Sequence, residues 1–443
     1  MGFLYPVLLR LFFLISAIII VSLSVTVLSD RQPPGLGQDL SLMAYHLNQN
    51  GVASLELSAN ESDPEPSMAY EPLYPLIQSV FLLFSDGNEM QAFSTECFLN
   101  AEQCPELNSL LKNAGIFFHI LMTIAAGWAM LILIQSTTPI LSPGAKMQRT
   151  AARQRMGPQV SETAIRMALP PGTKLLCVAV MLLIAFYPGF YIGTEALNPV
   201  SLTALLLLMH AATLSQMVCA SERRLHFAIL SGMTFGLLCL VEDTFLYLIP
   251  VYAVMSIFTL VKLNFSGFVR WVVMLGASAA IIAPWIMRNL ALLNVAGISK
   301  DVFDLSEAFT FGFSGNSFLS VLFISPQIGD IVLFPFLSFL FVVATATLMP
   351  LMIIMTVWGI WTRRLTLPIM VIPVWFLLFV AMIAPETLNE GALIAVTPFV
   401  FLMLCLAPIW WINARENYYR RLLDIPHSEL GVKKGFDKQN LVG

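Results

Sequence analysis

Charged side chains are scarce in this chain of 443 residues. Lys, Arg, Asp and Glu make up 11% of it, whereas a soluble domain typically carries about 25%. Hydrophobic residues make up 58%, and the mean hydropathy is +0.80. This composition suits a lipid environment and predicts a membrane protein. The net charge is −4 and no basic, aromatic-rich surface is apparent, which argues against nucleic acid as a partner.

The sequence also lacks the short motifs of several enzyme classes. It contains no GxGxxG, no Walker loop and no HExxH. These absences argue against an ATPase or a zinc protease, and no resident metal is predicted. An internal repeat is missing as well, which argues against the many transporters that are built from repeated halves.

Ten apolar runs are long enough to cross a hydrocarbon core about 30 Å thick, a distance that needs about 20 helical residues. The predicted spans cover residues 4–28, 114–134, 174–192, 200–219, 226–241, 244–261, 268–287, 332–358, 366–384 and 391–412. Clusters of Lys and Arg follow the even-numbered spans, and the positive-inside rule makes that side cytoplasmic, together with both termini. The predicted fold is an all-α polytopic membrane protein.

The first outward segment, residues 30–113, is long and acidic. It contains twelve carboxylates and only two basic residues. Residues 40–47 have the pattern of a short amphipathic helix, and residues 73–84 form an apolar run that is too short to span the membrane. We therefore expect a large extracytoplasmic loop that contains helices lying in the membrane interface.

Two of the six cysteines lie in this loop, at Cys97 and Cys104. If the loop faces an oxidising compartment, the Cys-x6-Cys spacing predicts a local disulfide. A metal site there is a weaker alternative, because no second Cys or His pair accompanies the two thiols.

Four segments, taken in order, resemble one family. They are Asp39–Gly51 followed by Ala69–Pro75, then Gly193–Pro199, then Gly236–Leu246, and finally Ala283–Leu290 with its Pro-Trp-x-x-Arg-Asn sequence. This order is similar to that of the GT-C class of polytopic glycosyltransferases, which includes protein O-mannosyltransferases and aminoarabinose transferases. The resemblance covers residues 1 to about 300. One departure is that the family often has Arg where this chain has Glu242 and Asp243.

The resemblance implies a glycosyltransferase that acts on the extracytoplasmic face. Its donor would be a polyprenyl-phosphate sugar, a lipid-linked substrate rather than a cofactor, and its acceptor is not specified by the sequence. Such a transfer needs a base for the acceptor's proton and positive charge for the leaving phosphate. Asp39 is the candidate base, and the alternative is a solvated or helix-capping Asp. Arg288 is the candidate partner of the donor phosphate, and the alternative is an interfacial anchor.

Further candidates lie in the same outward segments. Glu195 would be a second active-site acid, unless it is only a carboxylate at a membrane exit. Glu242 and Asp243 either cap the following helix or line the cavity, since carboxylates are costly to submerge in lipid. Tyr45 and His46 follow Asp39 by one to two helical turns and could add hydrogen-bond donors, although a bystander role for such a His is the more common case.

The predicted organisation has three parts: a GT-C-like catalytic membrane module at 1–300, a second outward loop with the C-terminal spans at 301–412, and a cytoplasmic tail at 413–443. A bacterial inner membrane is the favoured location, and the endoplasmic reticulum membrane is the alternative. Two other functions stay open. One is a catalytically silent scaffold or a transporter, and the other is a polytopic enzyme like an O-antigen ligase.

Overall fold

A computed structural model of the chain describes part of it: residues 38–55, 66–67, 70–83, 105–137, 173–185, 190, 199–219, 224–294, 298, 357, 369–376, 395, 398–399, 401–402 and 405. Every regular element in these residues is helical. The elements are α2 (Gln38–Asn50), α3 (Leu73–Leu82), α6 (Pro105–Thr137), α9 (Thr173–Ala185), α11 (Val200–Cys219), α12 (Arg224–Cys239), the 3₁₀-helix η3 (Asp243–Tyr247), α13 (Leu248–Val261) and α14 (Phe265–Leu293).

Four stretches of these helices are long and apolar enough to cross a membrane: Asn113–Leu133, Val200–Val218, Asp243–Val261 and Phe265–Leu293. Each overlaps a predicted span, and α9 and α12 overlap two more. The first predicted span and most of the last three lie outside the described residues, so the count of ten stays a prediction. One boundary differs from the prediction. Helix α6 begins at Pro105, so residues 105–113 belong to a helix rather than to the loop.

The two short helices predicted for the first outward loop are confirmed as α2 and α3. They pack against each other, and Asn48 of α2 donates a hydrogen bond to the carbonyl of Ser79 in α3 at 2.9 Å. Leu76, Val80 and Leu83 leave the other face of α3 apolar and exposed. Such a one-sided apolar surface is typical of a helix that lies in the membrane interface.

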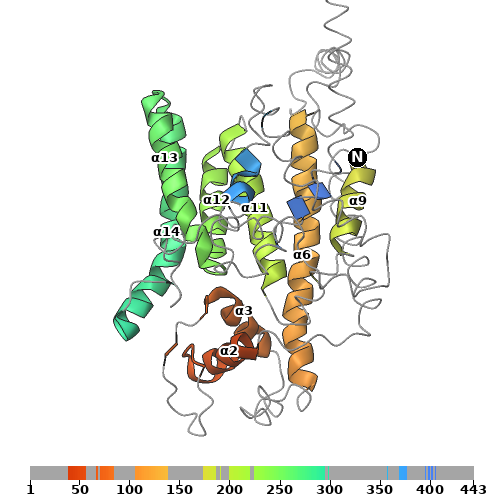
Figure 1. The fold of residues 1–443 in the computed structure, drawn as a ribbon, viewed down its shortest axis with the longest axis vertical. Coiled ribbons are helices and arrows are strands. Elements are labelled where there is room, and N and C mark those ends of the chain that lie inside the picture. The colour runs from red at the N-terminus through yellow and green to blue at the C-terminus, as the bar shows by residue number, and fades with distance from the viewer. Residues whose placement is uncertain are drawn as a thin grey trace, which may run out of the picture.

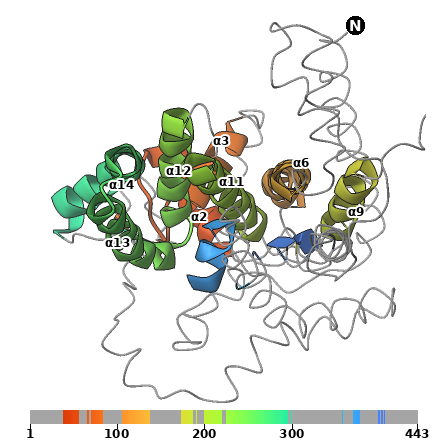
Figure 2. The ribbon, with the colours of Figure 1, turned by 90° about the horizontal axis from the view of Figure 1, so that it is seen from above.

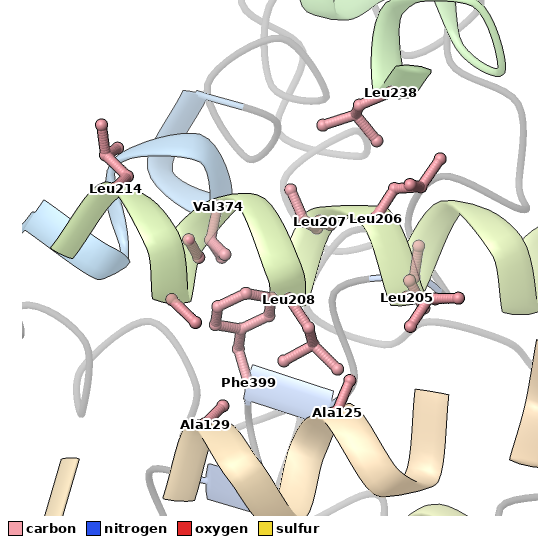
Figure 3. Close-up of a cluster of buried hydrophobic side chains, with 14 of the residues drawn as sticks. Ala125, Ala129, Leu205, Leu206, Leu207, Leu208, Leu214, Leu238, Val374 and Phe399 are labelled. Carbon is pink, nitrogen blue, oxygen red and sulfur yellow. The ribbon is translucent and has the colours of Figure 1, made fainter. Parts of the chain in front are cut away.

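The longer helices stand side by side in a row, in the order α14, α12, α11, α6 and α9, with α13 against α14 (Figure 2). Helices α2 and α3 lie together across the lower ends of the long helices, beneath the middle of the row (Figure 1). The core runs through the row, and Figure 3 shows one part of it. There, side chains of α11 and α6 meet Val374 and Phe399, two residues from much later in the chain.

Helices α12 and α14 run in the same direction at close range. A Cβ atom at Gly232 would overlap the backbone oxygen of Met274, and one at Gly236 would lie 2.9 Å from the backbone oxygen of Ser278. Gly232 faces Met274, and Gly236, four residues later, faces Ser278, which is also four residues later. The two helices are therefore parallel. The ends of both, after Cys239 and around Arg288, therefore point to the same side of the row.

A buried polar network joins three neighbouring helices. The Nε2 atom of His210 in α11 lies 2.7 Å from the Tyr252 hydroxyl in α13, and its Nδ1 atom lies 3.1 Å from the Ser231 carbonyl in α12. A carbonyl only accepts, so Nδ1 carries the proton and Nε2 accepts from the tyrosine. All three residues are buried, and satisfying these groups within the bundle favours one arrangement of the helices.

Three basic residues of the described helices lie at the end opposite α3. Arg224 begins α12, and Lys262 lies in the turn before α14. Arg270 donates a hydrogen bond of 2.6 Å to the Met217 carbonyl in the last turn of α11. At the other end, Leu73 of α3 donates to the Leu240 carbonyl, just past α12. The first outward loop and these cations therefore lie at opposite ends, which agrees with the orientation that the positive-inside rule predicts.

Candidate active site

Three carboxylates meet where the first loop contacts the end of α12. Glu71 precedes α3, and Glu242 and Asp243 form the break between α12 and α13. One ligand atom from each side chain lies within 4.8 Å of the others. The backbone hydrogen bond from Leu73 to Leu240, 3.1 Å long, holds the two segments together beside the cluster. We refer to Glu71, Glu242 and Asp243 as the carboxylate cluster.

The local geometry explains why Glu242 points into this cluster. Its backbone is extended (φ −148°, ψ 103°), and its side chain makes no capping bond to the following 3₁₀-helix. Instead, its Oε1 atom accepts a hydrogen bond of 2.7 Å from the Thr244 hydroxyl. Glu242 is only 8% exposed. The side chain of Glu242 therefore does not cap the following helix, and the alternative that it lines a cavity stays a prediction.

Burial and mutual repulsion keep protons on the cluster. The pKa of Glu71 is raised from 4.5 to about 8, chiefly by burial and also by the charges of Glu242 and Asp243, while hydrogen bonds from the backbone act to lower it. The pKa of Glu242 is raised to about 7, chiefly by burial; the hydrogen bond from the Thr244 hydroxyl acts to lower this pKa, and the charge of Asp243 acts to raise it. At neutral pH the cluster can therefore hold and release protons. When ionised, its oxygens are ligands suited to a divalent cation such as Mg²⁺ or Mn²⁺.

The other predicted site residues have mixed outcomes. Asp39 lies in the first turn of α2, and its side chain is not described. Tyr45 and His46 are both buried on α2, with their rings 5.7 Å apart, and His46 lies 3.4 Å from the Asn50 amide. This burial agrees with a packing role as well as with a site role. Glu195 and the Cys97–Cys104 pair lie outside the described residues and stay predictions.

Arg288 lies in the last turns of α14, on the same side of the bundle as the carboxylate cluster. Its guanidinium carbon is 4.4 Å from the centroid of the Trp285 ring, and its Nη1 atom donates to the Asn289 side chain at 2.8 Å. Trp285 has a further contact, because its indole N–H donates to the Ile298 carbonyl at 3.1 Å.

Sequence reasoning did not single out Glu71 as a site residue. It lies in the Tyr-Glu-Pro-Leu-Tyr segment that carries part of the family resemblance, and it is one of twelve carboxylates in the same loop. The available signal was its position directly before a Pro and an apolar interfacial helix, since such a helix holds the residue before it at the membrane surface.

We expect the carboxylate cluster to make stability fall as the pH rises. Because folding raises the pKa values of Glu71 and Glu242, the folded chain binds more protons than the unfolded chain between pH 4.5 and about 8. Their contribution to stability is thus present below pH 4.5 and lost as the pH rises through about 7 and then about 8. Thermal unfolding in detergent from pH 5 to pH 9 measures this slope.

The Glu71→Gln variant is the control for that measurement, because it keeps the shape and removes the titration. Its slope should be visibly flatter than that of the natural chain. Dicyclohexylcarbodiimide, which modifies protonated carboxyls in apolar surroundings, should label the peptide that contains Glu71 at pH 7 and much less at pH 9. Equal labelling at both values would contradict the raised pKa.

Comparisons with known proteins add a likeness in helix arrangement. No family model matches the sequence, and no curated protein matches it. The structure is similar to the crystal structure of the Archaeoglobus fulgidus oligosaccharyltransferase in its apo form, with a TM-score of 0.48 and 15% identity. The alignment covers 97% of this chain and 53% of the archaeal protein, so the chain spans about half the length of that protein. A likeness at this identity and TM-score assigns no reaction to this chain.

Proposed function

We propose that this chain is an integral membrane glycosyltransferase that moves a sugar from a polyprenyl-phosphate donor to an acceptor on the extracytoplasmic face. The observation that carries this proposal is the carboxylate cluster, in which the first outward loop and the end of α12 bring titratable groups together. Helix α3 starts beside this cluster, and α2, which contains Asp39, packs on α3. The four family-like segments of the sequence support the same reaction class.

The proposed reaction is a single displacement with Asp39 as the base. The acceptor hydroxyl oxygen forms a bond to the anomeric carbon of the sugar, and the bond from that carbon to the phosphate oxygen breaks. The acceptor proton passes to the Asp39 carboxylate, and the electron pair of the broken bond leaves with the polyprenyl phosphate. Arg288 binds the phosphate and stabilises its charge. Glu195 is proposed as a second acid, and the carboxylate cluster helps to orient the acceptor.

The direct test is the dependence of transfer on the lipid-linked donor. Membranes that contain the full chain are incubated with radiolabelled mannose, glucose or arabinose, each linked to a polyprenyl phosphate. Release of polyprenyl phosphate should exceed that from membranes without the chain, for at least one of these sugars. The matched control is the same sugar linked to a nucleotide, which should not be used. If no lipid-linked sugar is consumed, the catalytically silent alternative replaces this proposal.

A further inference from the structure

The end of α14 is fastened by two hydrogen bonds to one carbonyl. Helix α14 ends at Leu293, and the left-handed backbone of the next residue, Asn294 (φ 58°), turns the chain away from the helix axis. The Ile298 carbonyl then accepts from the Trp285 indole at 3.1 Å and from the Asn289 amide at 3.2 Å. Ile298 and Asn289 are both buried. We call Trp285, Asn289 and Ile298 the α14 bracket.

The α14 bracket holds Arg288 in one orientation. The guanidinium lies over the Trp285 ring, where the negative ring face attracts a cation. On the other side, Nη1 donates to Asn289 Oδ1, while the amide nitrogen of the same Asn289 is engaged by Ile298. Because both supports are themselves tied to a backbone carbonyl, the side chain has little freedom to turn. The arginine side chain therefore loses its conformational entropy when the protein folds, and ligand binding does not have to order it.

One nitrogen of this fixed guanidinium has no partner among the described residues. Within the part of the chain that the structure describes, Nη2 is buried and makes no hydrogen bond. A buried charged donor without an acceptor is costly, so an unsatisfied group of this kind is explained best by a ligand. The complementary ligand is an oxyanion, and a guanidinium matches the planar geometry of phosphate oxygens.

The surroundings of Arg288 suit an amphiphile. Leu292 follows Arg288 by four residues, so it lies on the same face of the helix, and it is 56% exposed. Met287, the residue before Arg288, is 68% exposed. An apolar surface beside a fixed cation at the membrane boundary fits a phosphate group that is attached to a lipid chain.

We propose that Trp285 and Asn289 are positioning residues that hold Arg288 as a preformed site for a single lipid-linked phosphate. The phosphate site itself does not depend on the proposed function. Only the identification of the bound phosphate as that of the sugar donor depends on it, because a phospholipid headgroup offers the same chemistry. One guanidinium carries a single positive charge, which suits one phosphate group rather than a pyrophosphate.

The experiment measures binding of a short-chain polyprenyl phosphate to the full chain in phosphatidylcholine nanodiscs, without any transfer step. The matching polyprenyl alcohol is the control ligand. The natural chain should bind the phosphate roughly 10- to 100-fold more tightly than the alcohol, which is the value of a hydrogen bond to a charged group. Arg288→Gln should abolish this preference and leave binding of the alcohol unchanged. Equal binding of the two ligands by the natural chain would overturn the proposal.

Variants of the bracket test the positioning role. Trp285→Phe keeps an aromatic ring beneath the guanidinium but loses the hydrogen bond to Ile298. Trp285→Leu loses both the aromatic ring and this hydrogen bond. Asn289→Leu removes the contact with Nη1. The preference for phosphate should fall in the order natural chain, Trp285→Phe, Trp285→Leu, with Asn289→Leu roughly tenfold below the natural chain. Leu263→Gln is the control, because Leu263 is exposed in the turn before α14, at the other end of that helix from Arg288, and this variant should bind as the natural chain does. If Trp285→Leu and Asn289→Leu both prefer the phosphate over the alcohol as strongly as the natural chain does, Trp285 and Asn289 do not position Arg288.

Binding of the alcohol separates this effect from misfolding, because a chain that is merely unfolded loses both ligands. The variants should keep alcohol binding while phosphate binding becomes weaker and less sensitive to salt. Competition with phosphatidic acid then identifies the source of the phosphate. If phosphatidic acid displaces the polyprenyl phosphate at equal concentration, the site is supported and the donor assignment fails. If polyprenyl phosphate binds selectively but no sugar is transferred, the site is supported and the proposed function fails.

Discussion

Replacing Asp39 by Asn should lower sugar transfer by roughly 10²- to 10⁴-fold, the usual contribution of a general base. Asn has nearly the same shape as Asp but cannot accept the acceptor's proton, so the change removes the chemistry with little effect on packing. Asp39 lies in the first turn of α2, where a negative charge is favourable, and the loss in stability should stay below about 1 kcal/mol. The measurement is the initial rate of polyprenyl phosphate release with saturating donor.

Gln49→Ala provides the control for this variant. Gln49 is exposed on the same helix, and its replacement should leave the rate within about twofold, as is usual for surface changes outside a site. Thermal unfolding of both variants shows whether α2 is still folded. A well-folded Asp39→Asn chain with the rate of the natural chain would remove Asp39 as the base, whatever the fate of the wider glycosyltransferase proposal.

Replacing Gly232 by Ala should destabilise the bundle by about 1–3 kcal/mol or more, the range for overpacking a well-packed core. The new Cβ would overlap the backbone oxygen of Met274 and lie 2.7 Å from the Cβ of Ala277. A backbone atom cannot turn aside as a flexible side chain can, so α12 and α14 must move apart. Thermal unfolding in detergent measures the loss, and Gly236→Ala should behave in the same way.

Gly276→Ala is the matched control, because a Cβ atom at Gly276 in α14 would meet nothing within 4 Å. This variant should be neutral or more stable by up to about 1 kcal/mol, since Ala has the higher helix propensity. Equal stability of the Gly232 and Gly276 variants would contradict the close packing of α12 on α14. The Gly232 variant should also alter the pH dependence of stability, because α12 leads directly into Glu242 of the carboxylate cluster.

The sequence by itself predicted a helical membrane protein; four described helices are long and apolar enough to span a membrane, α9 and α12 overlap two further predicted spans, and both short helices predicted for the first loop are present. These features follow from local composition. An apolar run of sufficient length must form a helix in lipid, because each backbone group needs an internal hydrogen bond there. The charges in the short connections then set the orientation, and the described helices place Arg224, Lys262 and Arg270 at one end as expected.

Only the tertiary structure decided which side chains meet. Glu71 is one of many carboxylates in its loop, and nothing local distinguishes it until α3 docks beside Leu240 and brings it to Glu242 and Asp243. Likewise, the sequence identified Arg288 as a cation near the membrane boundary, but its support by Trp285 and Asn289 depends on the turn that carries Ile298 back to the helix. Hydropathy specifies which segments enter the membrane, and the charges of the connections specify on which side they emerge. It leaves the rotation and spacing of the helices open, and these depend on contacts between distant residues, such as the close approach of Gly232 to Met274.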